Sequence, residues 1–246
     1  MRQAHGIELS PFLATSLRAA SILFPIILLP GVAVAQEEVT CPGIPGKFII
    51  LQNQPYALCA LATSYQFNDI TYAKCDVLNG NSMSLQQRFS SQGTTGNINT
   101  MNQGQPGRGG YIVSTYSPPA GATNPNGNLA VYTCEGGSSS QCDGGLCFTS
   151  TVGRDSPLWG HVGSKQIICS CPIKHTNLTF EVMGPKPCPT TAAAYDAVCG
   201  NNNGRNGAIT YIGAPPGVTY ENFSACFLKN TGGQPVTFNT CTRPAD

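Results

Sequence analysis

The sequence predicts a mainly β, disulfide-rich fold: an antiparallel sandwich or barrel of short strands with one short helix, in one or two subdomains. Short runs rich in β-branched and aromatic residues recur between turns of Gly, Pro and Asn, which is typical of such folds. The chain of 246 residues also holds twelve cysteines. An even cysteine count in an oxidising compartment indicates a framework of disulfides.

The first 35 residues predict a signal peptide. Arg2 and Arg18 precede an apolar run, Ala19–Leu29, and a small-x-small motif, Ala-Val-Ala, ends at Ala35, as signal peptidase requires. The run is too short for a membrane span of about 20 residues. We therefore expect cleavage after Ala35 and a secreted or periplasmic protein with no membrane span.

Charged side chains are scarce and balanced. The chain has 13 Lys or Arg and 12 Asp or Glu, for a formal net charge of +1. The sequence contains no basic patch that would bind phosphates or anionic lipid. We expect no nucleic-acid partner.

Residues beyond the signal peptide alternate between strand patterns and polar loops. One helix is predicted at 190–199, from a Thr cap, an Ala-rich body and Gly200 as the stop. A Gly/Asn-rich loop at 90–110 belongs to a predicted β subdomain, 36–120, which is followed by a disulfide-rich β subdomain, 121–246. The predicted strands are Lys47–Leu51, Tyr56–Phe67, Ile70–Val77, Met83–Phe89, Tyr111–Tyr116, Leu129–Thr133, Leu146–Val152, Gln166–Ile173, Leu178–Met183, Ala208–Ile212, Thr219–Leu228 and Val236–Cys241.

All cysteines are expected to form disulfides, and a hairpin rule suggests two of the pairs. Directly opposed antiparallel residues have the Cα separation that a disulfide needs. A two-residue turn at Gly233-Gln234, or a four-residue loop at Gly232–Pro235, would place Cys226 opposite Cys241, so we predict that bridge. Cys59 and Cys75 would face each other across a three-residue loop, whereas a tight Asn68-Asp69 turn would put them on opposite faces. The remaining cysteines are Cys41, Cys134, Cys142, Cys147, Cys169, Cys171, Cys188 and Cys199.

A metal centre is the alternative use of some of these cysteines. Cys169, Cys171 and His175 form a C-x-C-x3-H pattern that partly resembles zinc ligand spacing. An oxidising compartment favours disulfides instead. We expect no metal and no cofactor.

Catalytic signals are weak. The sequence has no G-x-S-x-G motif. Two carboxylates about 5–10 Å apart could cleave glycosidic bonds without a histidine. The candidate acids are Glu135, Asp143, Asp155 and Glu181.

A binding role has one candidate position. Trp159, the only tryptophan, lies in a polar loop between Asp155 and His161, and exposed aromatic rings often anchor ligands. The alternative is that Trp159 fills the core beneath its loop. These three residues are the predicted ligand-binding residues.

The sequence therefore predicts a structural or binding role, as a surface, matrix or appendage component or as a glycan- or protein-binding module. The expected partners are a second copy of the chain or an extracellular glycan or protein. The alternative is a carboxylate-based hydrolase of extracellular glycans.

Overall fold

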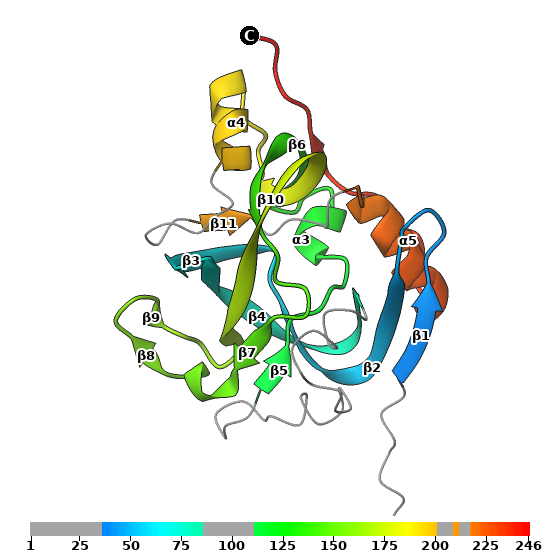
Figure 1. The fold of residues 1–246 in the computed structure, drawn as a ribbon, viewed down its shortest axis with the longest axis vertical. Coiled ribbons are helices and arrows are strands. Elements are labelled where there is room, and N and C mark those ends of the chain that lie inside the picture. Colours follow the sequence, from blue (N-terminus) through cyan, green and yellow to red (C-terminus); the bar gives the residue numbers. More distant parts are fainter. Residues whose placement is uncertain (1–35, 86–110, 201–208, 212–216) are drawn as a thin grey trace, which may run out of the picture. The chain divides into compact units, whose positions relative to one another are not determined.

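A long strand, β10 (Gln166–Pro185), joins the two halves of the sheet (Figure 1). Its first half pairs with β4 (Ile70–Leu85) and its second half with β6 (Leu129–Ser140). Strand β4 also pairs with β2 (Lys47–Leu58) and β3 (Leu61–Phe67). The structure is a computed structural model that describes residues 36–85, 111–200, 209–211 and 217–246. The predicted signal peptide, 1–35, and the loop at 90–110 lie outside these residues.

Five further strands complete a ten-stranded sheet, and two more form a separate hairpin. The principal order is β1-β2-β4-β10-β6-β12, and the described part of the sheet does not close into a barrel. The pair β6–β12 is parallel, whereas the other strand pairs are antiparallel. The predicted mainly β, disulfide-rich fold is confirmed. The remaining strands are β1 (Gln36–Thr40), β5 (Tyr111–Val113), β7 (Leu146–Phe148), β8 (Asp155–Ser156), β9 (Gly160–His161), β11 (Ile209–Tyr211) and β12 (Thr240–Cys241).

The described residues contain three α-helices rather than the single helix predicted. These are α3 (Ala120–Thr123), α4 (Ala192–Gly200) and α5 (Tyr220–Thr231). Helix α4 confirms the prediction for 190–199. None of the described helices is long and apolar enough to cross a membrane.

Helix α5 occupies most of the segment predicted as a strand at Thr219–Leu228, so that prediction is wrong. The buried side chains recur at positions i, i+3, i+4 and i+7, which is the spacing of one helix face. This face packs on the sheet, where the rings of Phe48 and Phe223 lie 5.3 Å apart. The buried residues on this spacing are Tyr220, Phe223, Ser224 and Phe227.

All twelve cysteines form disulfides, as predicted. The predicted bridge between Cys226 and Cys241 is wrong, because Cys226 belongs to a helix and not to a hairpin strand. The six bridges are Cys41–Cys226, Cys59–Cys75, Cys134–Cys199, Cys142–Cys171, Cys147–Cys169 and Cys188–Cys241.

The bridge Cys59–Cys75 forms despite a tight turn. Strands β3 and β4 meet at Asn68-Asp69, with Phe67 opposite Ile70. The extended strand is interrupted between β2 and β3, however. The β2–β4 pairing then places Leu58 opposite Asp76. That second register sets Cys59 opposite Cys75, with a Cα separation of 4.6 Å.

Strands on both sides of residue 120 belong to the same sheet. The division into subdomains 36–120 and 121–246 stays a prediction.

Candidate binding site

The candidate site begins on one face of the sheet. Tyr65 of β3 lies opposite Tyr72 of β4, and Lys74 of β4 lies opposite Ile168 of β10. Ile168 in turn lies opposite Phe148 of β7. Side chains alternate between faces along each strand, so these five residues share one face. The opposite face is buried and carries the disulfides Cys59–Cys75 and Cys147–Cys169.

The β8–β9 hairpin is tied to this face. The Thr151 hydroxyl donates to the carbonyl oxygen of Phe148 at 2.7 Å and accepts from the amide of Ile168 at 3.1 Å. The amide of Val162 donates to the carbonyl oxygen of Arg154 at 2.9 Å and closes the hairpin. The Lys74 ammonium then binds the carbonyl oxygen of Trp159 at 3.2 Å, which holds the hairpin loop on β4.

Trp159 is half-buried in this loop. Its ring packs edge-on against Tyr65, with ring centroids 5.3 Å apart and an angle of 84° between the planes. The indole N–H is buried and has no hydrogen-bond partner among the described residues. Trp159 is therefore neither a fully buried core residue nor a freely exposed ring.

A pocket of about 370 Å³ lies between the sheet face and the hairpin, and we call it the aromatic pocket. Three of its walls are aromatic rings: Tyr72 of β4, Phe148 of β7 and Trp159 of the hairpin loop. Two aliphatic residues and five polar residues complete it. Its lining residues are Tyr72, Phe148, Trp159, Val162, Ile168, Ser150, Thr151, Arg154, Asp155 and Ser156.

The structure brings the three predicted ligand-binding residues together. Trp159 and Asp155 line the aromatic pocket. His161 pairs with Asp155 across the β8–β9 hairpin, with Nδ1 2.9 Å from Oδ1. Both side chains are exposed, at 67% and 90%, so this contact adds little to stability. Its effect is to hold one carboxylate oxygen of Asp155 in place.

The pocket walls Tyr72 and Phe148 were missed by sequence reasoning. Each lies within a short strand pattern that is equally consistent with core packing. Only the cross-strand register, with Ile168 between β4 and β7, brings the two rings to the same face.

No protein-family model, curated protein or solved structure matches this chain.

Exposed apolar side chains continue the surface beyond the aromatic pocket. Leu158, which precedes Trp159, is 51% exposed, and Phe67, two residues after Tyr65 on β3, is 69% exposed. Ile70 lies opposite Phe67 and is 36% exposed. Adjacent exposed apolar residues often mark an interaction site.

The candidate acids do not gather in the aromatic pocket. Asp155 is its one carboxylate among the described residues. Asp143 accepts a hydrogen bond from Ser84, and Glu135 lines a different groove beside Cys134. Glu181 of β10 accepts a hydrogen bond from the amide of Tyr220, the first residue of α5. The two-carboxylate geometry of a glycan hydrolase is therefore not assembled there.

The C-x-C-x3-H pattern is divided among unrelated contacts. Cys169 and Cys171 are bonded to Cys147 and Cys142. His175 shares a hydrogen bond of 2.7 Å with the hydroxyl of Ser138, on the surface of β6 and β10. No described carboxylate hydrogen-bonds His175, so the third member of a Ser–His–acid arrangement is not present among these residues.

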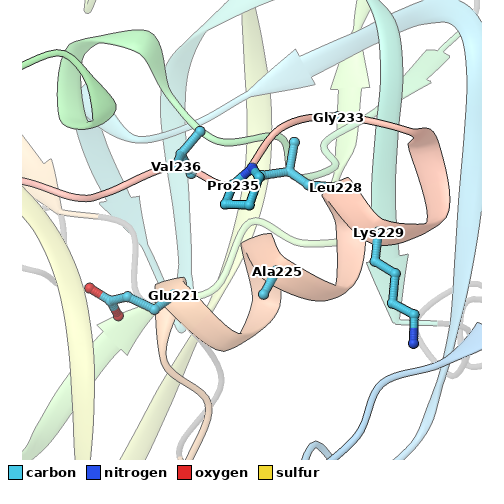
Figure 2. Close-up of a pocket in the computed structure, with 7 residues that line it drawn as sticks. All are labelled: Glu221, Ala225, Leu228, Lys229, Gly233, Pro235 and Val236. Atoms are coloured by element: carbon cyan, nitrogen blue, oxygen red, sulfur yellow. The ribbon is translucent and has the colours of Figure 1, made fainter.

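A second, smaller pocket lies between α5 and the chain that follows it (Figure 2). Its volume is about 170 Å³, which is below the roughly 300–1,000 Å³ of typical ligand sites. Figure 2 shows Leu228, Pro235 and Val236 over the helix, with Glu221 and Lys229 towards its two ends. Its described lining residues include fewer polar groups than those of the aromatic pocket, and none of them is aromatic.

Glu181 predicts a pH dependence of stability. Its Oε2 accepts from the amide of Tyr220 at 2.7 Å. Burial raises the pKa of this carboxyl from 4.5 to about 7, against the lowering effect of the Tyr220 hydrogen bond. The folded chain therefore keeps a proton that the unfolded chain releases, and stability falls as pH rises from about 4.5 to 7.

The Glu181→Gln variant tests this effect, because it keeps an acceptor for Tyr220 and removes the charge. We expect its free energy of unfolding in urea to match the wild type at pH 4.5 and to exceed it at pH 8. An equal difference from the wild type at both pH values would contradict the prediction.

Proposed function

We propose that this protein is an extracytoplasmic binding module and that the aromatic pocket holds its ligand. The mainly β fold and six disulfides are consistent with a stable protein of an oxidising compartment. A binding role needs, in addition, a built site on that scaffold.

The convergence of three rings on one pocket carries the proposal. Tyr72 and Phe148 come from strands far apart in the sequence, and Trp159 reaches them from the hairpin loop. The loop is held there although the indole N–H lacks a partner among the described residues. An apolar pocket with a few convergent polar groups is the usual form of a ligand site.

The hydrolase alternative has less support. It needs a second carboxylate near Asp155, and the other described candidate acids lie elsewhere. No observation of this pocket favours bond cleavage over binding.

Trp159 is the only tryptophan, so its fluorescence reports directly on the aromatic pocket. We expect saturable changes in emission with at least one of three probe classes: neutral oligosaccharides, acidic oligosaccharides and short aromatic peptides. Calorimetry on Trp159→Ala is expected to show binding at least about tenfold weaker, because the ring supplies one wall.

Leu178→Ala is the matched control. Leu178 is also apolar and exposed, at 62%, but it lies in the half of β10 that pairs with β6. Binding by this variant should equal that of the wild type. Failure of all three probe classes, or wild-type binding by Trp159→Ala, would overturn the proposal.

A further inference from the structure

We infer that the ligand of the aromatic pocket is a neutral glycan, with a pyranose ring packed against the aromatic walls. This inference rests on the proposed function of the pocket as a binding site. It adds the chemical class of the ligand.

The walls match the apolar face of a sugar ring. A pyranose presents C–H groups on its faces and hydroxyls around its edge. Tyr72, Phe148 and Trp159 offer aromatic surface to such a face. An aliphatic or a flat aromatic ligand would use the same walls, so the polar groups of the pocket decide between them.

The polar side chains that line the pocket can form hydrogen bonds with the hydroxyls of a sugar. Arg154 carries only N–H donors, and the next residue, Asp155, carries acceptors. His161 occupies Oδ1 of Asp155, whereas Oδ2 has no partner among the described residues. Ser150 and Ser156 also line the pocket, and their hydroxyls both donate and accept. Neighbouring sugar hydroxyls need such paired donors and acceptors.

The charges of the lining favour a neutral ligand. Among the described lining residues, Arg154 is the one cation and Asp155 the one formal anion, so their charges cancel. The Lys74 ammonium nearby is bound to the carbonyl oxygen of Trp159. An acidic ligand would meet the Asp155 carboxylate as well as the Arg154 guanidinium, so the lining offers it no net attraction.

The size and position of the pocket argue against a peptide. Its volume of about 370 Å³ is near the lower end of the roughly 300–1,000 Å³ typical of small-molecule sites. An extended peptide usually adds to a sheet edge, whereas this pocket lies on a sheet face under the hairpin. Phe67 and Leu158 continue the apolar surface, where further sugar units of a chain could pack.

The test is calorimetry on the full chain with neutral hexasaccharides of glucose, xylose, mannose and galactose. An oligogalacturonate and an aromatic hexapeptide serve as competing classes. We expect one neutral series to bind, and a tenfold increase in salt to change its Kd less than twofold. Tyr72→Ala is expected to weaken binding at least tenfold, Asp155→Asn about threefold, and Leu178→Ala not at all.

The outcomes separate the two proposals. Binding of only the acidic oligosaccharide, or of only the peptide, with loss of that binding in Trp159→Ala, overturns the glycan inference and leaves the pocket as a binding site. Neutral-glycan binding that survives both Tyr72→Ala and Trp159→Ala also overturns the inference. Binding of none of the probes overturns both proposals.

Discussion

Removal of the Cys41–Cys226 bridge is expected to lower the free energy of unfolding by about 5 kcal/mol. The bridge joins residues 185 positions apart, and it ties the segment after β1 to α5. Both cysteines are 5% exposed. Long loops gain most from cross-linking, because the bridge restricts the unfolded chain. Urea unfolding of the Cys41→Ala/Cys226→Ala variant measures the loss.

The bridge Cys59–Cys75 provides the comparison. Its cysteines are similarly buried, at 7% and 2%, but lie only 16 positions apart. Loop closure alone predicts a loss of about 3 kcal/mol when it is removed. A loss equal to or larger than that of the Cys41→Ala/Cys226→Ala variant would show that loop length is not the main source of stabilisation.

The Gly145→Ala variant is expected to lose about 3 kcal/mol or more. A Cβ on Gly145 would lie 2.2 Å from the carbonyl oxygen of Ser170 and 2.9 Å from that of Cys142. These are backbone atoms, and Cys142 and Cys147 on either side are bridged to β10. The chain therefore has little freedom to move away. Thermal unfolding should show a Tm lower by roughly 6–12 °C.

Gly200→Ala is the control for this clash. Gly200 ends α4, and its added Cβ would have no neighbour within 4 Å in the part of the chain that the structure describes. We expect a change within about 0.5 kcal/mol. If the two substitutions lowered the Tm equally, steric exclusion at Gly145 would not be the cause.

The strand content and the complete pairing of cysteines could be predicted from the sequence, because both depend on local patterns and composition. Helix α5 could not be separated from a strand in the same way, since short apolar runs are consistent with both. Two signals for the helix were nevertheless present. Thr219 caps its start, accepting from the amide of Asn222, and Gly232 ends it in a left-handed conformation with φ 72°.

The error in α5 also explains the error in the Cys226–Cys241 bridge. That prediction required two strands joined by a turn within Gly232–Pro235, and a helix removes the first of them. The Cys59–Cys75 bridge depends on the break before Leu61, because β2 and β3 pair with β4 in different registers on either side of it. No local pattern fixes the position of such a break.

The candidate site was partly predictable for a related reason. Asp155, Trp159 and His161 are close in sequence, so a single hairpin is enough to bring them together. Tyr72 and Phe148 join them only through the pairing of β4, β10 and β7. Long-range register is a property of the whole sheet and cannot be read from one segment.

The disulfide connectivity also determines the outcome of a backbone cut. Every peptide bond between Cys41 and Cys226 lies within the loop closed by their disulfide. The bonds from Cys226 to Cys241 lie within the loop closed by Cys188–Cys241. One proteolytic nick anywhere in that span leaves two fragments joined through sulfur. The nicked protein would keep its mass on a non-reducing gel, and only a reducing agent would release the pieces.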